Sequence, residues 1–155
     1  MKKTAFVFLL GILSVSFFIC KYAYCLEAKE ASASGEFEKI YNETPVKNGA
    51  REIMYAQFMK IRNSGEKYIL ADVLSCDDYR TGHIEGAISF PLSTITKENA
   101  VGKIPQGLPI IVYCLSYKCR SSTEAACKLS SYGYKVLNYK GGLDEWQEKN
   151  NKLVK

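Results

Sequence analysis

Short runs of apolar residues recur along the chain and predict the strands of a sheet. Such runs occupy residues 68–73, 87–90 and 108–113, and the third is the richest in β-branched residues. A fourth run, at residues 135–139, has the same character. A short apolar run without alternation is typical of a strand that is covered on both faces. We therefore expect a sheet with helices on either side.

Between these runs the apolar positions recur at helical spacing. Residues 50–62 predict one helix, which Gly65 would end, and residues 121–132 predict a second. A last helix follows Gly141-Gly142. Strands alternate with helices throughout, so the predicted fold class is α/β, with a mainly parallel sheet flanked by helices.

The first residues have the pattern of a secretory signal. Lys2 and Lys3 precede an apolar stretch that stops at Lys21, and this stretch is shorter than the roughly 20 residues that a membrane-spanning helix needs. Residues 1–25 are therefore predicted to be a signal peptide, cleaved before Leu26 or a few residues later. An uncleaved N-terminal anchor is the alternative. The expected location is the periplasm or another extracytoplasmic compartment.

The rest of the sequence predicts a polar segment followed by one folded domain. Residues 26–48 are small, polar and charged, as in a linker or an N-terminal arm, and residues 49–155 form the predicted domain. Without the signal, 130 of the 155 residues remain, and the net charge falls from +5 to +2 because three lysines are lost. So small an excess does not indicate a nucleic acid as partner, and a membrane would be contacted only through an uncleaved N-terminal segment.

The mature chain would contain four cysteines: Cys76, Cys114, Cys119 and Cys127. No two of them have the Cys-x2-Cys spacing of zinc sites, and His83 is the only histidine in the sequence. We therefore expect neither a metal nor another cofactor. A domain of this size does not need disulfides to fold, so the position of each cysteine has to indicate its role.

Cys114 directly follows the strongest predicted strand, and parallel α/β sheets bind ligands at the carboxyl ends of their strands. The loop after it contains two cations, and its backbone amides and the start of the next helix would favour a thiolate. We expect the pKa of Cys114 to lie well below the value of about 8.5 for a free cysteine, which would make it a nucleophile. The alternative is a small apolar residue packed at a strand end. The predicted anion-binding loop comprises Leu115, Ser116, Tyr117, Lys118, Cys119, Arg120 and Ser121.

Two groups of motifs resemble the two halves of a rhodanese domain. The first half is resembled by Asp72-Val73, Asp78-Tyr79, the heptapeptide GHIEGAI at 82–88, and Pro91-Leu92. The second half is resembled by Tyr113-Cys114, Ser122-x-x-Ala125-Ala126 and Gly141-Gly142-x-x-x-Trp146. The likeness extends over residues 52–147 and implies the rhodanese-like three-layer fold.

The resemblance also implies an activity. Rhodaneses are sulfurtransferases, so the loop cysteine, here Cys114, would take a sulfane sulfur from a thiosulfate-like donor, hold it as a persulfide and pass it to a thiophilic acceptor. The implied partners are a small sulfur-containing anion, attracted by Lys118 or Arg120, and a protein thiol acceptor. Family positions that shape the fold are matched by Asp72, His83 and Trp146.

The loop departs from the usual rhodanese pattern in two ways. Five residues separate Cys114 from Arg120, a spacing that resembles rhodanese-fold phosphatases, so phosphatase or arsenate reductase chemistry is an alternative. Cys119 makes the loop a Tyr-Cys-x4-Cys variant, in which the second thiol would resolve a persulfide or form a thiol-disulfide redox couple with the first. A non-catalytic binding module is the remaining alternative.

Overall fold

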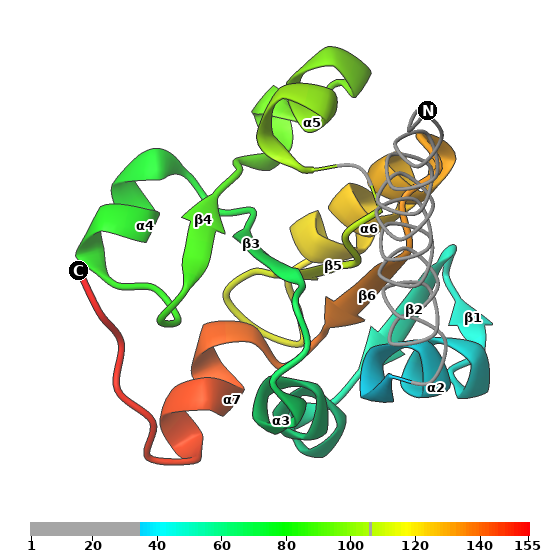
Figure 1. Ribbon diagram of the computed structural model, residues 1–155. Helices are drawn as coiled ribbons and strands as arrows, with labels where there is room; N and C mark the ends of the chain where they lie inside the picture. Colours follow the sequence, from blue (N-terminus) through cyan, green and yellow to red (C-terminus); the bar gives the residue numbers. More distant parts are fainter. Residues whose placement is uncertain (1–34, 106) are drawn as a thin grey trace, which may run out of the picture. The chain divides into compact units, whose positions relative to one another are not determined.

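The computed structural model describes residues 35–105 and 107–155 (Figure 1). The predicted signal peptide and the first part of the expected arm, residues 26–34, lie outside the described residues. None of the helices that the structure describes is long and apolar enough to cross a membrane. In chain order the elements are α2 (Glu36–Glu43), β1 (Val46–Lys47), β2 (Ala50–Ile53), α3 (Tyr55–Ser64), β3 (Ile69–Asp72), α4 (Cys76–Thr81), β4 (Ala87–Ser89), η1 (Leu92–Thr94), α5 (Lys97–Lys103), β5 (Ile110–Tyr113), α6 (Ser121–Ser131), β6 (Val136–Tyr139) and α7 (Gly142–Glu148).

The strands form one sheet in the order β1-β2-β6-β5-β3-β4. β1 is antiparallel to β2, whereas every other neighbouring pair is parallel. The central strand β5 places Tyr113 opposite Tyr139 of β6 on one side and opposite Asp72 of β3 on the other. The predicted α/β fold with a mainly parallel sheet is thereby confirmed. Because these strands are parallel, the carboxyl ends of β2, β6, β5 and β3 meet at one edge of the sheet.

Helices cover both faces of the sheet, as Figure 1 shows. Successive residues of β5 point to opposite faces. Ile111 and Tyr113 lie in one apolar cluster with α2, α3 and α7, whereas Ile110 and Val112 lie in a second cluster with α5 and α6. All four side chains are fully buried. This two-sided burial is the reason for the apolar run without alternation, and it produces the expected three layers.

One predicted helix is wrong at its start. Residues 50–53 form β2, and α3 begins only at Tyr55. Ala50 and Ile53 are buried and the two residues between them are half-buried, so the buried positions of this strand have the three-residue spacing of a helix. The parallel pairing of β2 with β6 overrides that local pattern.

Two short helices that the apolar pattern does not predict have hydroxyl caps at their N-termini. The Oγ of Ser75 accepts a hydrogen bond from the amide of Asp78 at 3.1 Å at the start of α4. The Oγ1 of Thr96 accepts one from the amide of Asn99 at 3.2 Å at the start of α5. Such caps satisfy amides that have no partner within the helix. They are polar signals, which a search for apolar periodicity does not detect.

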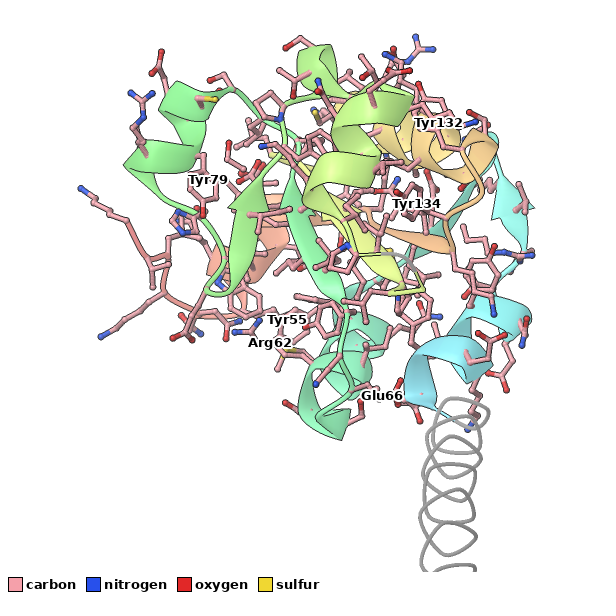
Figure 2. All side chains as sticks on the ribbon, turned by 45° about the horizontal axis from the view of Figure 1, so that its top comes forward. Tyr55, Arg62, Glu66, Tyr79, Tyr132 and Tyr134 are labelled. Carbon is pink, nitrogen blue, oxygen red and sulfur yellow. The ribbon has the colours of Figure 1, made fainter. Side chains whose placement is uncertain are left out.

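The second part of the expected N-terminal arm contains a docked helix. In α2, Phe37 and Ile40 are buried in the same apolar cluster as α3 and α7. The carboxylate of Glu66, labelled in Figure 2, accepts hydrogen bonds from the amides of Glu36 and Phe37 at the start of α2. Residues 36–48 are therefore part of the folded unit, which begins at Glu36 rather than at residue 49.

Replacing Phe37 by Ala tests whether α2 contributes to stability. The side chain is only 2% exposed, so its truncation should lower the free energy of unfolding by about 3 kcal/mol, measured by urea denaturation. Val46→Ala is the matched control, because Val46 is 60% exposed and its truncation should change stability by less than about 0.5 kcal/mol. Equal, small effects of the two changes would contradict the docking of α2.

Candidate active site in the cysteine loop

The loop between β5 and α6 lies at the edge of the sheet where the parallel strands end. Its first residue, Cys114, is 1% exposed. The Cys114 thiol donates a hydrogen bond to the Oγ of Ser122, at the start of α6, at 3.4 Å. The predicted nucleophile therefore lies at the expected place, but its sulfur is at the bottom of the loop and is held by the first turn of the following helix.

The start of α7 fixes the backbone of the loop. The amides of Leu143 and Asp144 donate to the carbonyls of Cys114 and Leu115 at 3.0 and 2.9 Å. Gly142 adopts a φ of 61°, and a Cβ atom there would lie 2.2 Å from the Cys114 carbonyl oxygen. Only glycine permits this approach, since it has no Cβ and tolerates a positive φ. The Gly141-Gly142 pair thus brings α7 against the cysteine.

Cys119 places a second thiol in the same loop as the first. The four cysteines of the described residues are free thiols, and Cys114 and Cys119 each affect the pKa of the other. Cys114 is buried, whereas Cys119 is half-buried and hence the more accessible of the two. The loop therefore contains a pair of sulfurs that differ in access to solvent.

The two thiols also differ in acidity. Burial, reinforced by the contact with Cys119, raises the pKa of Cys114, although the hydroxyl and amide of Ser122 oppose this effect. Burial works in the same direction on Cys119, but hydrogen bonds from Cys114, from Ser121 and from the amide of Leu115 outweigh it and lower the pKa of Cys119. The predicted low pKa of Cys114 is therefore wrong, because the loop donors favour a thiolate on Cys119.

Two amides of the predicted anion loop act on Cys119. The amides of Leu115 and Ser121 lower the pKa of its thiol and so favour the thiolate. The Cys119 amide itself is occupied, because it donates to the carbonyl of Ser116 at 3.0 Å and closes a turn. One amide of the loop is thus already used within the loop, and anion binding by the others stays a prediction.

The other side chains of the loop face solvent. Leu115 and Tyr117 are 50% and 42% exposed. Lys118 and Arg120 are exposed and form no ion pair with any residue that the structure describes. Both cations are therefore free to attract an anionic donor to the mouth of the loop.

Two further residues contact the cysteines, and the sequence alone assigns them no role. Ser122, at the start of α6, bonds Cys114. Lys140, directly after β6, donates from Nζ to the carbonyl of Cys119 at 2.8 Å. The order of strands in the sheet brings Lys140 to the loop, and a single sequence contains no local signal for that order.

The residues at the fold-shaping positions make local contacts. The Oδ1 of Asp72 accepts from the amide of Leu74 at 2.9 Å, and burial raises the pKa of Asp72. The His83 ring stacks on Tyr79, labelled in Figure 2, with 3.7 Å between the ring centroids. The indole of Trp146 donates to a backbone carbonyl of the C-terminal segment at 3.0 Å. These side chains join neighbouring segments of the fold.

The remaining cysteines lie elsewhere. Cys76 is exposed at the start of α4, and Cys127 is half-buried on α6, 3.7 Å from the carbonyl of Asn48. Within residues 35–105 and 107–155, no group of three or more His, Cys, Asp or Glu side chains is arranged to hold a metal. The chemistry that this edge of the sheet can support is that of the Cys114–Cys119 pair.

The comparison with known families agrees with this fold. A sequence profile of the Rhodanese-like domain matches residues 55–149. The chain belongs to the rhodanese-like family. Among solved structures, a Bacillus halodurans protein is similar with a TM-score of 0.61 and 25% identity, over 86% of this chain and 85% of its own. The rhodanese-like domain of an Anabaena protein has a TM-score of 0.52 and 26% identity, over 57% of this chain and 100% of its own.

A curated relative has the domain within a longer chain. An HTH-type transcriptional regulator of Mycobacterium tuberculosis is 27% identical over 95 residues, which are 61% of this chain and 41% of the regulator. This chain thus spans less than half the length of that relative. The likeness therefore concerns part of the regulator and not the regulator as a whole.

Alkylation of the reduced protein tests the order of acidity. Near neutral pH, Cys119 should react with iodoacetamide at least about tenfold faster than Cys114, because it is more accessible and a larger fraction of it is thiolate. Peptide mass mapping after timed quenching measures both rates, with the exposed Cys76 as internal reference. The difference should narrow as the pH rises and Cys114 ionises. Faster modification of Cys114 would contradict the assignment.

Proposed function

We propose that this rhodanese-like protein is a sulfurtransferase that holds sulfane sulfur as a persulfide on Cys114 and uses Cys119 as the partner thiol. The observation that supports it is the position of Cys114 directly after the central strand β5, with a second, more accessible thiol in the same loop. Family membership supports the class of chemistry, and the two exposed loop cations, Lys118 and Arg120, suit an anionic donor.

The first step transfers sulfur to Cys114. The thiolate of Cys119, or hydroxide at alkaline pH, accepts the proton of Cys114 as the Cys114 sulfur attacks the outer sulfur of a thiosulfate-like donor. The sulfur–sulfur bond of the donor breaks, and sulfite leaves with the electron pair of that bond. The product is a persulfide on Cys114, and the Ser122 hydroxyl and amide lie beside its inner sulfur.

The second step removes the sulfur. A thiophilic acceptor, such as cyanide or a protein thiol, takes the outer sulfur and returns Cys114 to the thiolate. Without an acceptor, Cys119 gives this proton to the outer sulfur and its thiolate attacks the inner sulfur, so that a Cys114–Cys119 disulfide forms and hydrosulfide leaves. A protein dithiol would then reduce this disulfide. Cys119 would thus allow the outer sulfur to be released as hydrosulfide when no acceptor is present.

A thiol-disulfide redox protein is the second candidate. The presence of two free thiols in one loop favours it, because their pKa values are coupled and one thiol is the more accessible. The phosphatase and arsenate alternatives gain less support, because they require an arginine over the reactive sulfur and Arg120 is exposed. The persulfide proposal also gives a reason for a cysteine at the bottom of the loop, where bulk water does not reach it.

Mass spectrometry of the intact protein after thiosulfate treatment tests the persulfide. At mildly alkaline pH, Cys119→Ser should gain the mass of one sulfur atom and lose it to cyanide. The wild type should lose two hydrogen atoms and release one equivalent each of sulfite and hydrosulfide. Cys114→Ser should gain nothing. Two controls extend the comparison: Cys76→Ser and Cys127→Ser should both behave as the wild type.

Two results would distinguish the candidates. If Cys119→Ser gains no sulfur, the persulfide proposal is wrong. If the wild type loses two hydrogen atoms without releasing sulfite, and does so equally with any mild oxidant, the protein is a thiol-disulfide redox protein.

We also propose that the protein is exported to the periplasm or another extracytoplasmic compartment. The support is the basic and apolar pattern of residues 1–25. N-terminal sequencing of the protein from its native host should begin at Leu26 or a few residues later. An intact N-terminus in the membrane fraction would favour the uncleaved anchor instead.

A further inference from the structure

Lys140 is a half-buried lysine at the edge of the sheet that contains the cysteine loop. It follows the last residue of β6, which is paired with β5. Its Nζ donates to the carbonyl oxygen of Cys119 at 2.8 Å and to the Oγ1 of Thr123 at 3.2 Å. The ammonium group therefore joins the second cysteine of the loop to the first turn of α6.

The peptide groups on both sides of Cys119 are held. Its amide donates to Ser116 at 3.0 Å, and its carbonyl accepts from Lys140. When both the amide and the carbonyl of a residue are anchored, its backbone dihedrals are restricted and the direction of its Cα–Cβ bond is set. Here the restricted residue is the one whose thiol has a pKa that depends on Cys114.

The lysine is itself held by the sheet. Its backbone amide donates to the carbonyl of Ile53 at 3.1 Å and so continues the pairing of β6 with β2. The Thr123 hydroxyl that it contacts also accepts from Asn138 at 3.1 Å and lies 3.5 Å from Glu52. The ammonium group thus belongs to a polar network that is fixed on two strands and on α6.

The other charged side chains near Cys119 are exposed or bonded to other residues. Lys118 and Arg120 are exposed neighbours in the loop, and Glu124 of α6 pairs with Lys128 on the surface at 3.7 Å. Glu52 of β2 reaches the network through Thr123. Among the described residues, Lys140 is the charged side chain with a hydrogen bond to the backbone of Cys119.

We infer that Lys140 is a positioning residue, which holds Cys119 against Cys114 so that the two sulfurs can exchange protons and bond to each other. The inference rests on the proposed pairing of the thiols and adds the residue that sets its geometry. A charge-assisted hydrogen bond to a carbonyl is strong enough to favour one conformation of a short loop.

The rate of disulfide formation tests this inference directly. Diamide oxidises the two thiols to the Cys114–Cys119 disulfide and is itself reduced to the hydrazine, so no sulfur donor is needed. The experiment uses the full chain with Cys76 and Cys127 replaced by Ser, and mass mapping of the loop peptide measures the rate. Lys140→Met should slow this oxidation about tenfold. Lys140→Arg, which keeps a long cationic donor, should restore most of the rate.

The control is Lys97→Met, which removes the same charge from an exposed position at the start of α5 and should oxidise at the wild-type rate. If Lys140→Met oxidises as fast as Lys97→Met, or if Lys140→Arg is as slow as Lys140→Met, the inference is wrong. Circular dichroism shows whether each variant is folded. If Lys140→Met does not fold, Lys140→Gln takes its place, because its shorter side chain keeps a polar end. Its oxidation rate is then compared with that of Lys97→Met in the same way.

The outcomes also separate this inference from the proposed function. A slow Lys140→Met together with no persulfide in the thiosulfate experiment would support the positioning residue and exclude the sulfurtransferase. A persulfide on Cys119→Ser after thiosulfate, together with equal diamide oxidation rates of Lys140→Met and Lys97→Met, would support the sulfurtransferase and exclude the positioning residue.

Discussion

The coupled ionisation of the Cys114 and Cys119 thiols is the interaction on which the proposed chemistry depends. Each sulfur alone would be ordinary, one buried at a strand end and one half-exposed in a loop. Together, the pKa of Cys114 is raised and that of Cys119 is lowered, so that Cys119 ionises first. Because the second charge would form beside the first, the pair is expected to lose its protons in two separate steps.

The fold holds the backbone of the two cysteines from two sides. The start of α7 holds the carbonyls of Cys114 and Leu115, and Gly142 permits its close approach. From the other side, Lys140 after β6 holds the carbonyl of Cys119. Both anchors come from segments that follow the loop in sequence by about twenty residues or more. The parallel pairing of β5 with β6 brings them to the same edge, so sheet order determines the site.

Much of the architecture could be predicted because the sheet is covered on both faces. The run ending at Tyr113 is apolar at every position since its residues alternate between two cores, and a short apolar run without alternation is typical of such a strand. β2 could not be predicted, because its local pattern is typical of a helix. Its buried ends, Ala50 and Ile53, have helical spacing, and only the pairing with β6 makes the segment a strand. The docked helix α2 gives a weak signal because Phe37 and Ile40 stand in a polar segment.

The position of Cys114 could also be predicted, because the carboxyl end of a central parallel strand is a general location for ligands. Its acidity could not. The sequence shows two cations and a helix start near the thiol, but burial opposes them, and the extent of burial follows from packing against α6 and α7. Likewise, the roles of Ser122 and Lys140 depend on distances between segments, which local spacing does not contain.

A pH titration of the thiolate ultraviolet absorbance tests whether the ionisations of Cys114 and Cys119 are coupled. The protein for this titration has Ser in place of every cysteine other than Cys114 and Cys119. We expect a first step below the pKa of a free cysteine and a second step above it. Cys119→Ser should remove the first step and leave a single late one. The contrary result is two overlapping steps at the pKa of an ordinary cysteine, with Cys119→Ser merely halving the absorbance change. It would show that the two thiols do not interact and would contradict their coupling.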